Sequence, residues 1–349
     1  MIILNLMTLN GIVKKMTFED FIQEWKNEKD YIKVFTSGST GKPKEILLKK
    51  DFVITSALRT INFFNININS RLHSCISPDF IGGKMMAVRS LIAKAAFTCE
   101  IPSNEPLKNI SSDEVIDLLA VVPSQMLYIL EHQAQMPVIS NIIIGGSSIN
   151  PCLRKKIIES RYNAYETYGM TETASHIALR KIDTENSPFR LLPEISISID
   201  SQNCLKIKFQ TGEEFQTNDI VEIVSDSEFI IKGRKDNIII SGGRKINPLE
   251  IEEKISQLIA NPFCITGFPD KKWTEKIILI IEGQQTDLLD LKTYLRRILK
   301  PWENPKDIMF VSVLPRTRNG KIIRPKCLSD LSSFAHDNNL SSLKQNRPE

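Results

Sequence analysis

Apolar residues near the start of the chain follow a helical rhythm that soon gives way to strands. The spacing of its aromatic residues predicts a helix within 16–30, and the apolar run that follows predicts a short strand at 31–35. A second strand is expected at 45–48 and a second helix at 51–64, capped at its front by Asp51. A stretch rich in glycine and hydroxyl side chains separates the two strands.

Farther along, apolar strand-like runs alternate with amphipathic helices. The strands are expected at 115–122 and 141–144, and the helices at 123–133 and 151–160. Alternation of this kind is typical of a sheet covered by helices, so the sequence predicts a mixed α/β fold.

The pattern then changes to closely spaced short strands, which predict an antiparallel, barrel-like subdomain at about 187–232. A segment with its own strands and helices follows the sequence G-R-K-D. We therefore expect an N-terminal domain at 1–235 and a small α+β domain at 236–328. The remainder, 329–349, is rich in Ser, Asn and Gln and is expected to be a flexible tail. A length of 349 residues agrees with two domains.

Charge and cysteine usage exclude several classes of partner. The 45 Lys and Arg residues exceed the 41 Asp and Glu residues too slightly to indicate a nucleic-acid partner. The six cysteines form no C-x-x-C pair and no His stands at zinc-ligand spacing, so neither a disulfide framework nor a metal knuckle is expected. Free thiols fit a reducing cytoplasm. No apolar run is long enough for a membrane span, and the first fifteen residues make a poor secretion signal.

The stretch F-T-S-G-S-T-G-K-P-K at 35–44 has the composition of a phosphate cradle. It is not the P-loop of nucleoside triphosphatases, which needs the spacing G-x-x-x-x-G-K-[ST] and opens a helix. Its glycines still free the backbone to point N–H groups inward, while hydroxyl and lysine side chains add donors and charge. The alternative is a loop that only turns the chain. The residues of the candidate cradle are Thr36, Ser37, Gly38, Ser39, Thr40, Gly41, Lys42 and Lys44.

Three further segments carry candidate chemistry. The sequence Y-G-M-T-E-T at 168–173 places a hydroxyl beside a carboxylate, a pair that suits a phosphate oxygen and its Mg²⁺ ion. The segment from 233 combines basic and acidic residues with a glycine pair where the domains are expected to join. The turn L-P-R-T-R-N-G-K at 314–321 presents Lys321 near the end of the chain. Taken singly, these segments could be a plain loop, a hairpin with solvated charges and a surface lysine.

In this order, the four segments closely resemble the adenylate-forming superfamily of acyl-CoA synthetases, luciferases and peptide-synthetase adenylation domains. The resemblance covers about 31–324. Within the superfamily, T-Y-G-M-T-E-T-A-S-H-I-A-L-R at 167–180 and S-P-D-F-I-G-G-K-M-M at 77–86 look most like o-succinylbenzoate-CoA ligases of menaquinone synthesis. The implied fold is a large nucleotide-binding domain followed by a small mobile one.

The resemblance implies ATP, Mg²⁺ and coenzyme A as cofactor and co-substrates. The run from Thr36 to Lys44 would cover the β- and γ-phosphates. Thr171 would contact the α-phosphate and Glu172 would hold Mg²⁺. The other nucleotide-binding residues that it implies are Tyr168 and Gly169 in the same motif, Gly145, Gly146 and Ser147 beside adenine, and Asp219 and Arg234 at the ribose.

The same resemblance assigns the catalytic and domain-movement residues. Lys321 would bridge the attacking carboxylate and the α-phosphate, and Asp236 would be the hinge about which the small domain turns between half-reactions. The turn would bring Ser241, Gly242 and Gly243 to the channel for coenzyme A. The acyl pocket would include Phe80, Ile81, Gly82 and His176, although a lone histidine is more often structural.

Several alternatives remain open at this stage. The acid could be another aryl or fatty carboxylate, or the acceptor thiol could belong to a carrier protein. A non-catalytic nucleotide-binding paralogue is a further alternative, against which Lys321, Glu172 and Asp219 count. Only about 35 residues precede the glycine-rich stretch, far fewer than in many relatives, so the core is expected to depend on a partner subunit, such as a second copy in a homo-oligomer.

Overall fold

The chain folds into two compact units, which are described separately. The computed structural model describes residues 16–36, 44–185, 187–284, 288–317 and 321–331. Unit 1 comprises 1–217, 221–230 and 318–321, and unit 2 comprises 218–220, 231–317 and 322–349. The long segment of unit 2 thus begins shortly before residue 236, where the small domain was expected to start.

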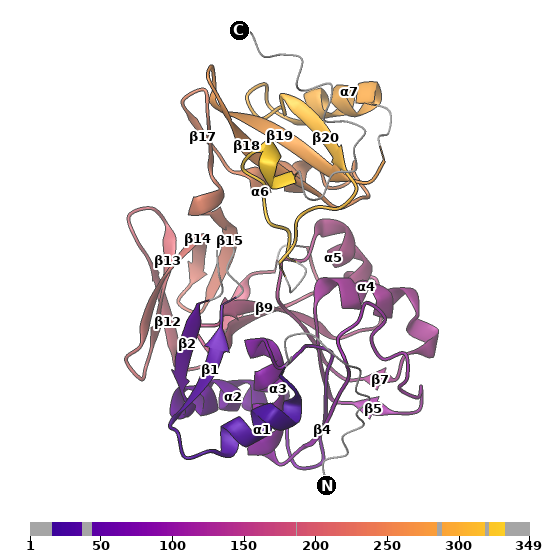
Figure 1. The fold of residues 1–349 in the computed structure, drawn as a ribbon, viewed down its shortest axis with the longest axis vertical. Coiled ribbons are helices and arrows are strands. Elements are labelled where there is room, and N and C mark those ends of the chain that lie inside the picture. The colour runs from indigo at the N-terminus through magenta and orange to yellow at the C-terminus, as the bar shows by residue number, and fades with distance from the viewer. Residues whose placement is uncertain (1–15, 37–43, 186, 285–287, 318–320, 332–349) are drawn as a thin grey trace. The chain divides into compact units, whose positions relative to one another are not determined.

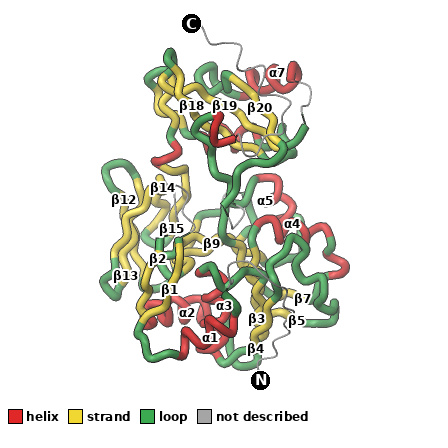
Figure 2. Tube along the Cα trace, viewed as in Figure 1, coloured by secondary structure: helices red, strands yellow, loops and turns green. Residues whose placement is uncertain are grey.

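Unit 1 is built on a large sheet to which parallel and antiparallel strands both contribute (Figures 1 and 2). Its strand order is β12-β13-β14-β15-β11-β10-β9-β8-β6-β3-β4. Strands β4, β3, β6, β8 and β9 pair in parallel, and β9 pairs with β10 antiparallel. The strands are β3 (Arg71–Ser74), β4 (Ala96–Cys99), β6 (Leu118–Val121), β8 (Ile142–Ile144), β9 (Ala164–Met170), β10 (Ser175–Lys181), β11 (Phe189–Leu191), β12 (Ile195–Ile199), β13 (Cys204–Phe209), β14 (Glu214–Ser225) and β15 (Glu228–Arg234).

The short strands predicted at 187–232 correspond to β11–β15. They do not form a sheet of their own but continue the large sheet, because β11 pairs with β10 on one side and with β15 on the other. Two smaller pairs of strands complete unit 1. They are β1 (Tyr31–Phe35) with β2 (Glu45–Lys49), antiparallel, and β5 (Val115–Ile116) with β7 (Val138–Ile139), parallel.

The helices α1, α2, α4 and α5 of unit 1 lie where the apolar periodicity predicts them, apart from one cap, whereas α3 was not predicted. The helices are α1 (Phe18–Lys26), α2 (Lys50–Phe64), α3 (Ile81–Ala93), α4 (Pro123–Glu131) and α5 (Pro151–Ile158), with a 3₁₀ turn η1 (Gln133–Gln135) after α4. The sequence predicts that Asp51 caps α2, and this prediction is wrong. The helix starts one residue earlier than expected, and Lys49 occupies the N-cap position. Asp51 lies in the first turn, where its negative charge still favours the helix dipole.

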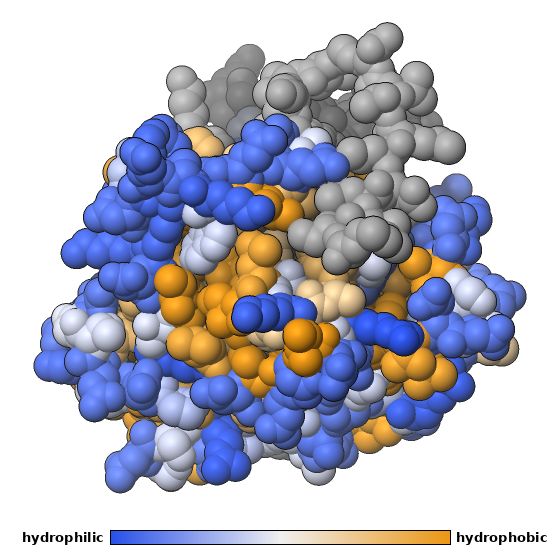
Figure 3. All heavy atoms as spheres, turned by 90° about the horizontal axis from the view of Figure 1, so that it is seen from below, coloured by the Kyte–Doolittle hydropathy of each residue, from blue (hydrophilic) through white to orange (hydrophobic). Residues whose placement is uncertain are grey.

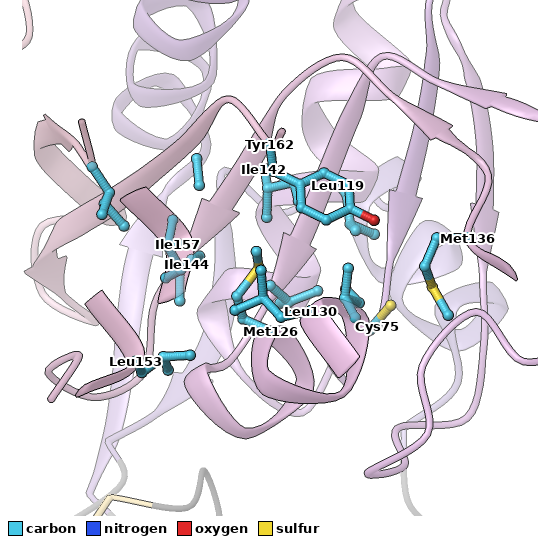
Figure 4. Close-up of a cluster of buried hydrophobic side chains, with 14 of the residues drawn as sticks. Cys75, Leu119, Met126, Leu130, Met136, Ile142, Ile144, Leu153, Ile157 and Tyr162 are labelled. Carbon is cyan, nitrogen blue, oxygen red and sulfur yellow. The ribbon is translucent and has the colours of Figure 1, made fainter. Parts of the chain in front are cut away.

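One apolar core holds the parallel strands to α4 and α5 (Figure 4). Burial of each large aliphatic side chain in such a core stabilises the fold by about 1.5–3 kcal/mol. The labelled members of this cluster are Cys75, Leu119, Met126, Leu130, Met136, Ile142, Ile144, Leu153, Ile157 and Tyr162. This core fixes the carboxyl ends of β6, β8 and β9, where the sequence motifs lie.

Unit 2 has a smaller sheet with an apolar core on each face. Along β19, the residues Ile277, Leu279 and Ile281 belong to one core and Ile278 and Ile280 to the other, as the two-residue period of a strand requires. The elements are the 3₁₀ turn η2 (Lys235–Asn237), β16 (Ile239–Ser241), β17 (Arg244–Ile246), α6 (Pro248–Ile255), β18 (Phe263–Asp270), β19 (Thr274–Glu282), α7 (Leu288–Ile298), β20 (Asp307–Val311) and the 3₁₀ turn η3 (Leu328–Leu331).

Folded structure in unit 2 extends into the segment expected to be a tail, because Leu331 is buried in one of these cores. Residues 332–349 lie outside the described part of the chain. Within that part, no helix has both the length and the apolar character that a membrane crossing needs.

The surface of the molecule exposes some large apolar side chains. Seen from below the view of Figure 1, apolar side chains gather between charged ones (Figure 3). Among the described residues, Ile68 and Ile101 are 66% and 75% exposed. Dependence on a partner subunit stays a prediction, which the mass of the protein in solution would test.

Candidate active site

Glycine is required where β8 ends beside β9. The N–H of Gly145 donates to the Val121 carbonyl oxygen at 3.1 Å. A Cβ on Gly145 would lie 2.6 Å from Thr167 Oγ1, closer than real Cβ contacts allow. Gly146 follows with φ 87°, a left-handed angle that glycine adopts without strain. The predicted adenine segment, Gly145 to Ser147, is therefore a close passage of backbone at the carboxyl edge of the parallel strands.

The turn between β9 and β10 carries the predicted catalytic pair. Thr173 is completely buried, and its Oγ1 accepts the Met170 N–H at 3.0 Å while lying 2.7 Å from the Ser175 carbonyl oxygen. This bonding closes the turn and leaves Thr171 and Glu172 half-buried within it. Both side chains therefore stand at the same edge of the sheet as the Gly145 passage.

The same turn contains stored backbone strain. Ala174 and Ser175 have φ values of 52° and 84°, which non-glycine residues rarely adopt. A Cβ on Gly169 would lie 2.2 Å from the Ser175 carbonyl oxygen, so only glycine fits there. Tyr168 is held by edge and tilted ring contacts with Phe229 and Phe189. Strain of about 1–3 kcal/mol per residue persists where packing imposes it and is common at functional sites.

The ends of the glycine-rich stretch are pinned together. The Thr36 N–H donates to the Lys44 carbonyl oxygen at 3.0 Å, and the Lys44 N–H donates to Thr36 Oγ1 at 3.1 Å. The stretch thus connects two antiparallel strands, which agrees with the sequence prediction. It does not connect a strand to a helix, as a P-loop would. The six predicted cradle residues between them, Ser37, Gly38, Ser39, Thr40, Gly41 and Lys42, lie outside the described residues.

In unit 2, one guanidinium joins the predicted ribose residues to the predicted hinge. Arg234 donates from Nη1 to Asp219 Oδ1 at 2.9 Å. It also forms a bidentate pair with the Asp236 carboxylate, donating from Nε to Oδ1 at 2.9 Å and from Nη2 to Oδ2 at 2.8 Å. Hydrogen bonding to Asp236 and the charge of Asp219 raise the pKa of Arg234, although burial opposes them. The side chains of all three predicted residues therefore meet in one charge-assisted network.

The predicted coenzyme A segment forms a tight hairpin. Gly242 and Gly243 have φ values of 56° and 75°, the pattern of a type I′ turn between β16 and β17. Ser241 is buried, and a Cβ on Gly242 would come within 3.1 Å of the Trp273 ring. The hairpin interpretation left open by the sequence is confirmed, and the role toward coenzyme A stays a prediction. Lys321 is described and exposed, but the three residues before it are not described.

The predicted acyl-pocket residues lie at the front of α3 and on β10. Phe80 is the N-cap of α3, and Ile81 and Gly82 form its first turn. His176 on β10 is 5% exposed, with its Nε2 2.9 Å from Thr60 Oγ1. Burial, with a smaller contribution from the charge of Arg89, lowers the pKa of His176 well below its ordinary value. The imidazole is therefore neutral at pH 7 and suited to hydrogen bonding.

Arg89 on α3 is a residue of this region that the sequence analysis missed. Its side chain is 1% exposed and donates only to Met86 Sδ, at 3.6 Å, while Nε and Nη2 have no hydrogen-bond partner among the described residues. Burial lowers the pKa of Arg89 to about 9. An unpaired buried cation is destabilising and normally has an anionic partner. A single arginine within the apolar run K-M-M-A-V-R was the available sequence signal.

Each unit carries groups of the kind that a magnesium-bound nucleotide needs. The carboxylate of Glu172 is a hard oxygen ligand of the kind that Mg²⁺ prefers, and the Asp219 carboxylate can accept two hydrogen bonds from a ribose diol. Bound Mg²⁺ would supply charge neutralisation at the phosphates.

Comparison with known proteins identifies the family of the chain. Residues 13–233 match the family described as AMP-binding enzyme, and residues 256–321 match the AMP-binding enzyme C-terminal domain. A 2-succinylbenzoate-CoA ligase from Listeria monocytogenes is 27% identical over 338 residues, which cover 88% of this chain and 71% of that protein.

Two solved structures are also similar. An AMP-forming acyl-CoA synthetase/AMP-acid ligase II-like protein from Dyadobacter fermentans is 32% identical with a TM-score of 0.58, covering 90% of this chain and 93% of that one. The o-succinylbenzoate CoA synthetase of Bacillus subtilis, in complex with its acyl-adenylate intermediate, has a TM-score of 0.75 at 20% identity, covering 88% and 70%. The second likeness shows the fold alone. With the family match spanning most of unit 1 and a second match in unit 2, the chain belongs to the AMP-binding enzyme family.

Proposed function

We propose that the protein is an AMP-forming acid-CoA ligase that activates 2-succinylbenzoate. ATP and the acid would form the acyl adenylate and pyrophosphate, and coenzyme A would then take the acyl group and release AMP. The family membership and the relatives named above support this reaction class. Free cysteines throughout the chain agree with a cytoplasmic enzyme.

The buried Arg89 is the structural observation that supports this acid. 2-Succinylbenzoate has two carboxylates, of which only one is activated. The other must enter the acyl site as an anion, and leaving it unpaired there would be costly. The Arg89 guanidinium is the complementary group, since it is 1% exposed and its Nε and Nη2 have no hydrogen-bond partner among the described residues. A monocarboxylic fatty acid has no second carboxylate and would leave the Arg89 guanidinium unmatched, so Arg89 favours a dianionic substrate.

We assign the predicted site residues to separate roles in the reaction. Thr171 would donate to the α-phosphate and Glu172 would hold the magnesium ion. Lys321 would offset the charge of the attacking carboxylate and the phosphate in the first step. Neutral His176 would contact the acyl group as a hydrogen-bonding partner, not as a base.

Replacing Arg89 with methionine should separate substrate recognition from stability. We expect kcat/KM for 2-succinylbenzoate to fall by about 10- to 100-fold, because a charge-assisted hydrogen bond contributes about 1.5–3 kcal/mol. Thermal stability should stay equal or rise, since an apolar side chain replaces an unpaired buried charge. Pyrophosphate release with a panel of 2-succinylbenzoate, benzoates and fatty acids, with and without coenzyme A, measures the first effect. Calorimetry measures the second.

Arg59→Met is the matched control for this experiment. Arg59 is a buried cation of the neighbouring helix α2, but it is ion-paired with Glu194 at 3.4 Å. Its loss should lower stability without changing the preference among acids. If Arg89→Met retains its preference for 2-succinylbenzoate over benzoates, Arg89 does not recognise the second carboxylate. A parent enzyme that activates only fatty acids would refute the proposed substrate.

Replacing Asp219 with alanine should raise the KM for ATP by about tenfold and leave the KM for the acid nearly unchanged. The carboxylate would bond the ribose of one substrate only, so its loss affects one KM. Initial rates with each substrate varied in turn test this. Asp226→Ala, an exposed carboxylate in the turn after β14, is the control. An unchanged KM for ATP would remove Asp219 from the nucleotide site.

A further inference from the structure

Three potential metal ligands meet where two parallel strands of unit 1 end. His73 lies on β3, Cys75 directly follows β3, and Glu100 directly follows β4. The ligand atoms of the three side chains all lie within 4.8 Å of one another. His73 and Cys75 are both 1% exposed, whereas Glu100 is half-buried. The group is thus nearly enclosed, with one side open toward solvent.

His73 presents an unpaired nitrogen to this group. Its Nδ1 is 2.8 Å from Thr98 Oγ1, the neighbouring side chain on β4. Its Nε2 is buried and has no hydrogen-bond partner in the described part of the chain. The nearest carboxylate oxygen, Glu100 Oε2, is 3.9 Å away, too far for a hydrogen bond. A buried polar atom in a native structure is normally satisfied, so Nε2 is available to bind an ion or a water molecule.

The other two ligands are positioned by the backbone. The Glu100 carboxylate accepts the Leu107 N–H at 3.0 and 3.3 Å, which fixes its orientation while leaving oxygen lone pairs available. The N–H of Cys75 donates to the Ala120 carbonyl oxygen at 3.2 Å, and the Cys75 carbonyl oxygen accepts from Gln125 Nε2 at 3.0 Å. The thiol therefore projects from a backbone segment that is bonded on both sides.

We propose that His73, Cys75 and Glu100 bind a Zn²⁺ ion, with water in the fourth position. A nitrogen, a sulfur and an oxygen ligand suit zinc and exclude magnesium, which takes oxygen ligands in an octahedron. Tetrahedral zinc places ligand atoms about 3–4 Å apart, so side-chain rotations that move these atoms by about 1 Å would complete the site. Binding releases the thiol proton to solvent. The Thr98 bond to Nδ1 is the outer contact that orients metal-binding histidines.

Spacing along the chain could not predict this group. His73 and Cys75 are separated by one residue, but Glu100 joins them only because β3 and β4 pair in parallel, with Ser74 opposite Cys99. The bound metal would tie β3 to β4 and fix the start of the segment that leads from Cys75 into α3. This zinc site is distinct from the magnesium site proposed at Glu172, because the two sites share no residue and Mg²⁺ is a hard cation.

The experiment is a cobalt titration of the full-length protein after removal of metals by a chelator. Saturating Mg²⁺ is kept in all samples so that hard-cation sites are filled. We expect about one Co²⁺ per chain, with the near-ultraviolet absorption of a cobalt-thiolate bond, and displacement by one equivalent of Zn²⁺. Cys75→Ser should abolish this absorption. Glu100→Gln and His73→Gln should weaken Co²⁺ binding by about tenfold or more.

Cys99→Ser and Cys204→Ser are the controls. Cys99 is a thiol on the same pair of strands and Cys204 is a buried thiol on β13, and neither belongs to the group. Both variants should keep the cobalt-thiolate absorption. A parent protein without that absorption overturns the proposal, whether or not the variants fold. The proposal also fails if Cys75→Ser retains the absorption or if Cys99→Ser loses it.

Discussion

The Lys321→Ala protein should form acyl adenylate about 10²- to 10³-fold more slowly than the parent, yet convert a supplied acyl adenylate to the thioester at a near-normal rate. The size of the effect follows from removing one preorganised donor at developing charge, about 2.7–4 kcal/mol. The asymmetry follows from the chemistry. Only the first step brings an anionic carboxylate to an anionic phosphate, whereas the second step brings a thiol to a mixed anhydride.

Each half-reaction can be measured alone. Single-turnover pyrophosphate release reports the first, and thioester formation from synthetic acyl adenylate reports the second. Lys326→Ala removes another exposed lysine five positions later and should change neither rate. Equal loss of both half-reactions in Lys321→Ala would mean that the lysine supports the fold or the nucleotide generally and not the adenylation step. That result would leave the reaction class intact and remove the assigned role.

Most elements of the fold were predictable because they depend on local periodicity. The runs at 31–35 and 45–48 and the helix after the second run are found close to their expected bounds. The exception at Asp51 has a local cause. The chain enters α2 directly from β2, so the backbone of Lys49 takes the cap position without a side-chain bond. A residue with strong cap propensity one position inside a helix start is easily taken for the cap.

Pairing between strands could not be predicted to the same degree. The turns at 187–232 indicate antiparallel neighbours, but only the contact of β11 with β10 decides that these strands extend the large sheet. Such pairings join residues far apart in the sequence and depend on the whole fold.

Some residues of the candidate site could also be found from the sequence, and others could not. Gly145, Gly169 and the turn at Thr173 lie in short motifs that the family resemblance singled out, and close backbone approach explains the glycines there. Arg89 and the His73 group became visible only through what surrounds them. An arginine in an apolar helix suggests a buried charge, but the absence of a partner for its Nε and Nη2 among the described residues is a property of the folded neighbourhood.

Replacing Asp236 with proline should leave acyl-adenylate formation near its normal single-turnover rate and slow transfer to coenzyme A by about tenfold or more. A hinge must absorb a large backbone change at one or two positions, and proline fixes φ near −65° and removes an N–H group. The substitution should trap the conformer that tolerates this angle. We expect that conformer to be the one that forms the adenylate.

The network around Arg234 requires one further variant. Asp236 forms a bidentate pair with Arg234, which also contacts Asp219, so any change at Asp236 also disturbs two predicted ribose residues. Asp236→Ala removes the same carboxylate but keeps the backbone free to rotate. If hinge motion is what matters, Asp236→Ala should raise the KM for ATP and transfer normally, whereas Asp236→Pro should fail in transfer. Equal transfer rates in both variants and the parent would show that the second half-reaction does not depend on rotation about Asp236.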